Sequence, residues 1–331
     1  MTTLRLLRFP NDFAPIGEMI CEAFQYPENP EWSVQTDEKE QIAHAITTLR
    51  RLWPLFRIMQ IVSPSLRDFF RGYVAVEDDK IVGLTLLQRR GTTNAWVVGT
   101  VGVLPEYRRR GLARAGLEKS LDLMRERGAS KTWLGVIDGN TPAQSLYRSL
   151  GFELYDGTTD YTLTDPAAPN VPPLPSGYTI TKLKRSDWKT RYDLEDRIAP
   201  DETRRYEPIE KGRFRSPLMM RLLVPIMNLL QREKEEDFIV RTSPNGRPVA
   251  RFGYSASMRG KGVNSIRIRL DPEHPDLAPH LVHTALAKVV SLSPTLRVEI
   301  GVPRWMPAVA AAAEACGFRR RVEYLKMGRP L

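Results

Sequence analysis

The sequence predicts an α/β (α+β) protein made of two similar domains in tandem. Three observations lead to this prediction. Apolar patterns typical of strands and helices alternate through the first half of the chain. A break at residues 165–177, which holds five prolines, interrupts them. A similar order of strands and helices then begins again at Tyr178.

Length and composition describe a soluble globular chain. Its 331 residues are enough for two domains, and 42% of them are hydrophobic and 27% charged. No apolar run approaches the roughly 18 residues of a membrane span, and the first residues lack a signal-peptide pattern. The two cysteines, Cys21 and Cys316, lie in different halves, which favours a reducing cytoplasm. The four histidines show no zinc-ligand spacing, so we expect no metal site.

The first half, residues 1–165, is expected to be a complete α/β domain. Asp78-Asp79 lies between two apolar runs and favours a hairpin. Pro54 and Pro64 are expected to break a long helical region, and a strand at 161–163 is expected to close the sheet. The expected strands are 4–9, 72–77, 80–89, 95–104, 134–137 and 161–163, and the expected helices are 12–24, 37–70, one opening at residue 111 and one over 141–150.

The second half, residues 178–331, is expected to repeat this pattern after a semi-rigid linker at 166–177. The expected strands are 178–183, 238–241, 248–255 and 266–270, with a turn at 244–246 and helices near 191–197 and 217–232. The two halves differ in charge. The first 165 residues hold 20 Lys and Arg against 21 Asp and Glu, whereas the rest hold 29 against 18. The basic character of the chain therefore comes from its second half.

The most informative segment covers residues 101–117 and reads V-G-V-L-P-E-Y-R-R-R-G-L-A-R-A-G-L. A strand ends at Pro105, three arginines follow, and Gly111 opens a helix. The N-terminus of a helix presents unpaired amides and the positive end of its dipole, which suit an anion. Small residues at positions 111 and 113 leave this backbone accessible. The segment is therefore predicted to cradle a pyrophosphate.

This segment resembles the coenzyme A loop of the GNAT superfamily of N-acetyltransferases, in which Arg/Gln-x-x-Gly-x-Gly/Ala follows a strand. Arg108, Gly111 and Ala113 occupy the three defined positions. In a second segment, a short strand precedes a capped helix that carries Asn140 and Tyr147 at the family's seven-residue spacing. The resemblance implies a mixed, mainly antiparallel sheet flanked by helices in each domain, with acetyl-CoA as the cosubstrate.

The resemblance also implies roles for individual residues. The backbone of Val101, Gly102 and Val103 would bind the pantetheine arm and the acetyl carbonyl, and Asn140 would hold the arm a second time. Tyr147 would protonate the leaving thiolate while a primary amine attacks the thioester directly in a ternary complex. The loop residues implied to bind the cofactor, largely through backbone amides, are Arg108, Arg109, Arg110, Gly111, Leu112, Ala113 and Arg114.

The resemblance does not identify a general base. Some family members carry a glutamate five residues before the asparagine, but that position here is Gly135. A water chain, Asp138, Glu77 or a residue of the long helical region are the candidates that remain.

The second half has lost the residues of this chemistry. A proline removes a backbone donor, and a histidine obstructs the close approach of an anion to the backbone. We therefore predict a single active site in the first domain, with the second domain as scaffold and substrate wall. The residues aligned with Arg108, Gly111, Ala113, Asn140 and Tyr147 are Pro275, Ala278, His280, Met306 and Ala313.

Two alternatives remain open. The basic second half, with arginines such as Arg267 and Arg269, is compatible with a nucleic-acid- or ribosome-associated protein, although its charges are dispersed and no reading motif accompanies them. Within the transferases, a tandem synthase resembling mycothiol synthase is the other alternative. The sequence leaves the acceptor, the acyl chain length, the oligomeric state and any ligand of the second domain undetermined.

Overall fold

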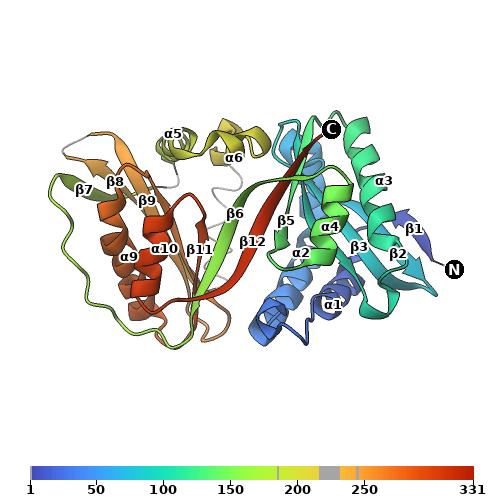
Figure 1. Cartoon of the computed structure of the whole chain (residues 1–331), viewed down its shortest axis with the longest axis horizontal. Coiled ribbons are helices and arrows are strands. Elements are labelled where there is room, and N and C mark those ends of the chain that lie inside the picture. The colour runs from blue at the N-terminus through green and yellow to red at the C-terminus, as the bar shows by residue number, and fades with distance from the viewer. Residues whose placement is uncertain (1, 185, 216–231, 244–245) are drawn as a thin grey trace. The chain divides into compact units, whose positions relative to one another are not determined.

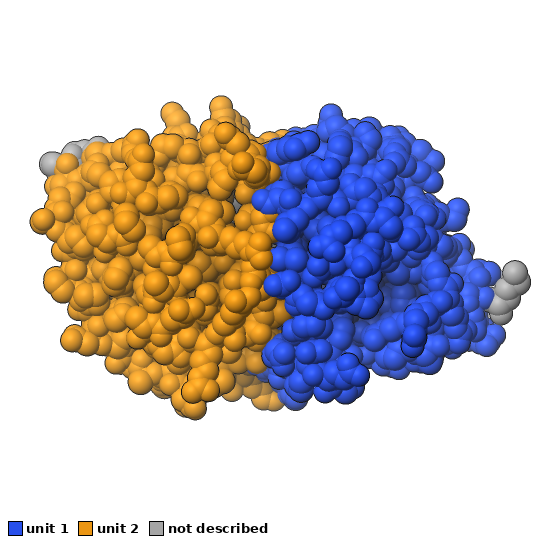
Figure 2. Space-filling model, in the orientation of Figure 1, with its two compact units in different colours: residues 1–155, 205–208, 325–331 blue, residues 156–204, 209–324 orange. Residues whose placement is uncertain are grey.

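The chain forms two compact units, which Figure 2 colours separately. The computed structural model describes residues 2–184, 186–215, 232–243 and 246–331. The first unit comprises the chain up to Tyr155 together with Arg205–Pro208 and Leu325–Leu331. The second comprises Asp156–Arg204 and Ile209–Tyr324. The units thus exchange short segments relative to the ranges 1–165 and 178–331 expected from the sequence.

The first unit is a sheet with helices on both faces (Figure 1). Its strand order is β1-β2-β3-β4-β5-β12, with β4 and β5 parallel and β1 to β4 antiparallel. One core lies between the sheet and α3 and α4, and a second lies beneath α1. The strands are β1 (Thr3–Leu6), β2 (Arg71–Glu77), β3 (Lys80–Arg89), β4 (Ala95–Val103), β5 (Lys131–Ile137) and the end of β12 (Arg319–Pro330). The helices are α1 (Phe13–Ala23), η1 (Pro30–Trp32), α2 (Thr36–Val62), η2 (Pro64–Leu66), η3 (Pro105–Tyr107), α3 (Leu112–Glu126) and α4 (Thr141–Ser149).

The strand that closes the first sheet is not the one expected. The segment at 161–163 belongs to β6 (Glu153–Leu163), which pairs antiparallel with β11 (Val298–Pro303) in the second unit. The place beside β5 is taken by the end of β12. The apolar pattern identified a strand correctly, but a local pattern carries no information about a pairing partner more than a hundred residues away.

The long helical region is interrupted at one proline and not at the other. Helix α2 ends at Val62, before Pro64, as predicted. The predicted break near Pro54 is wrong, because α2 continues through this residue. Pro54 costs the helix one backbone hydrogen bond. The aromatic packing of the neighbouring residues Trp53 and Phe56 offsets that loss. The rings of Trp53 and Phe56 stack on each other with their centroids 5.4 Å apart and join an aromatic cluster with Phe13.

The second unit has the same plan. Its strands follow the order β12-β6-β11-β10-β9-β8-β7, and the expected strands at 178–183, 238–241, 248–255 and 266–270 are confirmed. Apart from Arg232, the expected helix at 217–232 lies outside the described residues, as do turn residues 244–245. The remaining elements are β7 (Tyr178–Lys182), α5 (Trp188–Ile198), α6 (Asp201–Tyr206), α7 (Lys211–Phe214), β8 (Glu233–Thr242), β9 (Pro248–Ser257), β10 (Asn264–Leu270), η4 (Pro275–Leu277), α9 (Ala278–Leu292) and α10 (Pro307–Ala315).

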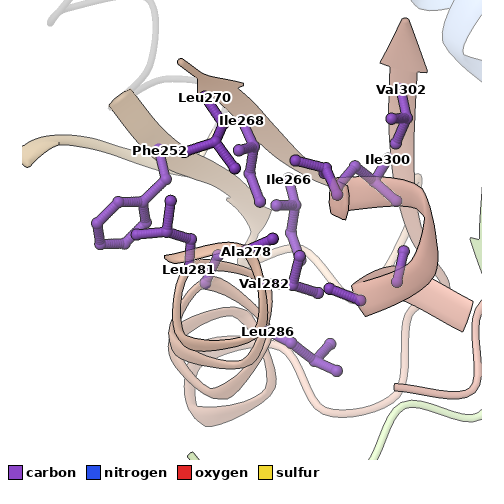
Figure 3. Close-up of a cluster of buried hydrophobic side chains, with 14 of the residues drawn as sticks. Phe252, Ile266, Ile268, Leu270, Ala278, Leu281, Val282, Leu286, Ile300 and Val302 are labelled. Atoms are coloured by element: carbon purple, nitrogen blue, oxygen red, sulfur yellow. The ribbon is translucent and has the colours of Figure 1, made fainter. Parts of the chain in front are cut away.

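Apolar side chains of α9 form the centre of the second unit's core. Figure 3 shows Leu281, Val282 and Leu286 of this helix together with strand residues of the same core cluster. The opposing side chains, which include Phe252 and Ile268, come from β9, β10 and β11. Across the described residues of both units, no helix is long and apolar enough to cross a membrane.

Candidate functional site

The central strands of the first unit separate at one end. β4 and β5 pair in parallel up to Val98 and Leu134, and both strands continue beyond this last pair. At the same point the register between β3 and β4 shifts, which leaves Gly99 as an extra residue in β4. Such a bulge bends a strand, and a strand that has lost its partner presents unpaired backbone groups. The open edge of β4 therefore begins at the bulge and includes residues 101–103.

The bulge also changes which side chains face each side of the sheet. Val98 and Val101 both pack toward α3 and α4, although they are three residues apart. Gly102 faces α1, where an added Cβ would lie 3.1 Å from the ring of Phe24. The glycine at this position therefore lets α1 approach the strand closely.

The helix that follows β4 begins without a cap. Arg109 and Gly111 both adopt left-handed backbone conformations, with φ of 62° and 77°. Gly111 is the N-cap of α3, no side chain caps the helix, and its first turn contains no acidic residue. A Cβ on Gly111 would meet no atom within 4 Å, so the space in front of these amides is open. The first turn of α3 thus combines orphan N–H groups with the positive end of the dipole.

The four arginines of this loop have different surroundings. Arg108 donates to two backbone carbonyls, that of Val103 at 3.2 Å and that of Ala23, at the end of α1, at 2.8 Å. Arg110 lies 3.6 Å from the Glu77 carboxylate. Arg114 donates to Ser149 at 2.7 Å, which places α4 beside the first turn of α3. Arg109 is exposed. Arg108 therefore fixes the loop to α1. Arg110 and Arg114 also have acidic neighbours, since Arg114 lies 3.8 Å from Glu118.

Asn140 begins the helix that carries the second predicted site residue. Its side-chain oxygen accepts a hydrogen bond from the amide of Ala143 at 3.3 Å, so the oxygen caps α4. The buried Gln144 donates to the carbonyl of Ile137 at 3.3 Å and ties α4 to the end of β5. Because the cap uses only the oxygen of Asn140, its amide NH₂ group is still able to donate to a ligand.

Tyr147 lies two turns further along α4, on nearly the same side of the helix as Asn140, and is 6% exposed. Its ring meets that of Phe152 edge-on, with centroids 6.1 Å apart. Burial raises the pKa of Tyr147 above its ordinary value, and the nearby Tyr26 phenol raises it further. The phenol is therefore a hydrogen-bond donor at any physiological pH.

An aromatic pair that sequence reasoning missed lies close to these residues. Tyr26 and Trp32 meet edge-on with centroids 5.8 Å apart. The Trp32 ring covers Gly139, where an added Cβ would lie 3.2 Å from it. Burial raises the pKa of Tyr26, and the charge of Arg108 opposes that rise. The signal available in the sequence was three aromatic residues in the short segment between two helices, Tyr26, Trp32 and the preceding Phe24.

The structure places Gly135 and the two carboxylates that are candidates for the general base, Asp138 and Glu77, as follows. Gly135 is exposed, and a Cβ there would meet no atom within 4 Å. Asp138 is exposed just after β5. Glu77 accepts a hydrogen bond from Thr2 and forms the ion pair with Arg110. Position 135 is therefore an open place on β5.

The corresponding helix of the second unit begins differently. η4 runs directly into α9, and none of the described residues from 271 to 292 has a positive φ. Leu277 and Ala278, at the start of α9, are fully buried. Figure 3 places Ala278 among the apolar side chains of the core. The first turn of α9 is thus covered by hydrophobic packing where that of α3 is open.

One group of possible metal ligands occurs in the described part of the second unit. Ligand atoms of Asp271, Glu273 and His274 lie within 4.8 Å of one another. Asp271 is paired with Arg197 at 2.9 Å, and His274 Nδ1 is bonded to the Tyr178 hydroxyl at 2.7 Å. The expectation that the protein binds no metal stays a prediction.

Comparison with known proteins identifies the first unit. The sequence pattern of the acetyltransferase (GNAT) family matches residues 29–152. This segment belongs to the GNAT family. N-alpha-acetyltransferase 30 of Schizosaccharomyces pombe is 33% identical over 95 residues, which are 28% of this chain and 63% of the relative. Mycothiol acetyltransferase of Thermobifida fusca is 40% identical over 74 residues, 22% of this chain and 23% of the relative. The matches thus span less than two thirds of either relative.

The fold of the whole chain is that of tandem GNAT proteins. A tandem GNAT protein from the clavulanic acid biosynthesis pathway superposes with a TM-score of 0.63 and 15% identity, over 100% of this chain and 98% of that one. The sequence prediction of two GNAT-like domains in one α/β chain is confirmed. The predicted roles of residues 101–103, 108–114, Asn140 and Tyr147 in the GNAT site stay predictions.

Proposed function

We propose that the first unit transfers an acetyl group from acetyl-CoA to a primary amine. One observation carries the proposal: the open edge of β4 leads directly into the uncapped N-terminus of α3, and Arg114 joins that turn to α4. This arrangement fits an acyl-CoA, because an amide-containing arm can pair with a strand edge while its pyrophosphate lies on helix amides. GNAT proteins use acetyl-CoA, which supplies the activated acetyl group when bound.

Different residues bind the pyrophosphate and the pantetheine arm of the coenzyme. The amides from Arg109 to Arg114 hold the pyrophosphate, and the exposed arginines add screened positive charge. The backbone of residues 101–103 pairs with the arm, and the Asn140 amide group contacts it from the other side of the opening. Arg108 acts by fixing the loop to α1 through its two carbonyl contacts.

Tyr147 supplies a hydrogen bond to the sulfur as the thiolate leaves. Its raised pKa keeps the phenol protonated, although the same shift makes it a weaker acid. The amine attacks directly, since both reactants are held in one site and the alignment itself lowers the barrier. The Tyr26–Trp32 pair borders the place where the acceptor enters.

We infer that the protein has one such site. The buried start of α9 and its lack of a left-handed turn support the loss of the second cradle. Titration calorimetry with acetyl-CoA should give one tight site per chain. Two tight sites would defeat the inference, and no binding at all would defeat the proposed function.

An assay with a panel of amines should identify the acceptor. Thiol release from acetyl-CoA is followed with amino acids, polyamines, peptides with free α-amines and a cysteinyl sugar, the last because of the match to mycothiol acetyltransferase.

The rival nucleic-acid function is less favoured by the structure. Arg267 pairs with Glu235 at 2.7 Å and Arg321 with Glu299 at 3.3 Å, so these guanidiniums already have anionic partners. Salt-dependent RNA or DNA shifts would support that rival.

A further inference from the structure

Gly135 leaves an open place on the face of β5 opposite α3 and α4. Its neighbours Leu134 and Val136 pack into the core beneath those helices, so residue 135 points the other way. It is the first residue of β5 beyond the last pair with β4. The open space above it therefore lies where β4 and β5 begin to separate, at the position of the glutamate found in some family members.

The neighbouring strand places a lysine beside this position. The amide of Leu331 donates to the carbonyl of Ser130 at 3.0 Å, which fixes β12 as the partner of β5. Counting five residues back along β12 and five forward along β5 from this bond sets Lys326 opposite Gly135. The core supports this register, because Leu325 and Met327 pack in the same cluster as Leu134 and Val136. The side chain of Lys326 thus shares the face of Gly135.

Lys326 holds a carboxylate on that face. Its Nζ donates to Oε1 of Glu207 at 2.8 Å, and the hydroxyl of Tyr155 donates to the same oxygen at 2.9 Å. The Glu207 side chain is 14% exposed. Both bonds end on Oε1, which leaves Oε2 to meet another donor. Arg205–Pro208, Tyr155 and Leu325–Leu331 are all parts of the first unit, so the carboxylate belongs to the same unit as the GNAT site.

The segment that carries Glu207 has other anchors. Lys131 donates to the carbonyl of Arg205. The Tyr206 ring is 2% exposed and lies 4.9 Å from that of Tyr155. A Cβ on Gly328 would lie 2.4 Å from Tyr206, so β12 fits closely beneath it. Attachment of the segment therefore does not depend on the Glu207 carboxylate.

We propose that Glu207 is the proton acceptor that replaces the missing glutamate at position 135. This inference rests on the proposed acetyl transfer. The amine nitrogen bonds to the acetyl carbon, the carbon–sulfur bond breaks, and its electron pair leaves with the sulfur. The sulfur takes a proton from the Tyr147 phenol, which regains one from solvent. The surplus proton of the amine passes to Glu207, directly or through one water, and then to solvent.

The first test is Glu207→Gln, which keeps an oxygen for Tyr155 and Lys326 but removes the base. Thiol release from acetyl-CoA is measured with water and with ethylamine as nucleophiles. We expect kcat to fall about 100-fold, while the Kd for acetyl-CoA stays within about twofold because the coenzyme contacts lie elsewhere. Glu323→Gln is the matched control, since Glu323 is also ion-paired and its side chain is 9% exposed, but it lies in the second unit. Thermal unfolding of both variants checks their fold.

The second test uses the charge beside the carboxylate. The groups around Glu207 are Lys326 of β12, Tyr155 of β6, and Lys131 and Arg205 at the base of the segment. Lys326→Met removes one of the two donors that hold Oε1, so the carboxylate loses its position and kcat should fall about 10-fold while the Kd for acetyl-CoA stays within about twofold. If the carboxylate only attaches the segment to β12, kcat should stay unchanged in this variant.

The outcomes separate the two proposals. Loss of acetyl-CoA binding by the wild-type protein defeats the proposed function. Absence of thiol release by the wild type above buffer, with every amine of the panel, also defeats the proposed function. Normal binding and transfer with equal kcat for wild type and Glu207→Gln, or an unchanged kcat in Lys326→Met, defeats the role of Glu207 alone.

Discussion

Replacement of Gly111 by alanine tests the pyrophosphate cradle directly. An L-residue at φ 77° costs about 1 to 2 kcal/mol of folding free energy. No further steric cost is expected, because a Cβ there meets nothing within 4 Å. That open space is, however, where the coenzyme's phosphates would lie. A lost hydrogen bond to a charged group is worth about 1.5 to 3 kcal/mol, so the Kd for acetyl-CoA should rise about 10- to 150-fold.

Gly128 provides the matched control at the other end of α3. Its φ is 74°, and a Cβ there would also meet nothing within 4 Å. Gly128→Ala should therefore destabilise the protein as much as Gly111→Ala but leave the Kd unchanged. Calorimetric titration and urea unfolding of both variants give the comparison. Equal changes in Kd for the two variants, or none for Gly111→Ala, would refute the assignment of the cradle.

Three further predictions follow from single side chains. Tyr147→Phe should lower kcat by roughly 100-fold, while the Kd for acetyl-CoA changes less than about twofold. Because the pKa of this phenol is raised, it should give the wild-type rate profile no alkaline limb. Unchanged thiol release by the variant would remove Tyr147 from the reaction. Gly116→Val should lower the midpoint of thermal unfolding, because even a Cβ would lie 2.7 Å from Thr85 Oγ1; an unchanged midpoint would show that the sheet yields there. Burial alone would raise the pKa of Asp12, but the hydrogen bonds from Arg5 and the Arg8 amide hold it below its usual value. Its stabilising contribution is therefore present above about pH 4 and lost as the pH falls through the folded-state pKa, so acid unfolding of Asp12→Asn should be less steep in that range than that of the wild type.

The sequence predicted the strand–loop–helix from 95 to 126 well because its signals are local. Pro105 ends a strand, Gly111 permits a left-handed turn, and the apolar residues of α3 recur at helical spacing. The same holds for α4, where Asn140 caps the helix and Pro142 occupies its first turn. The capping oxygen of Asn140 shows the limit of this reasoning, because a residue read as a ligand also has a structural task.

The features that were missed depend on contacts between distant parts of the chain. The bulge at Gly99 follows from how two strands pair, and the continuation of α2 through Pro54 depends on rings contributed by other elements. Neither the exchange of β6 for β12 nor the contact between Lys326 and Glu207 leaves a local pattern. The last two join residues that are far apart in the chain: Leu331 bonds to Ser130, 201 positions away, and Lys326 bonds to Glu207, 119 positions away.

The completion of the first sheet by Leu325–Leu331 has a consequence for folding during synthesis. Leu325 and Met327 are core residues of the first unit, yet they are translated about 170 residues after Tyr155. At 5 to 20 residues per second the ribosome needs roughly 10 to 30 s to cover that distance. Throughout this time β5 has an unpaired edge, which is open to incorrect pairing. The GNAT unit at the beginning of the chain therefore reaches its native state only when the final strand is made.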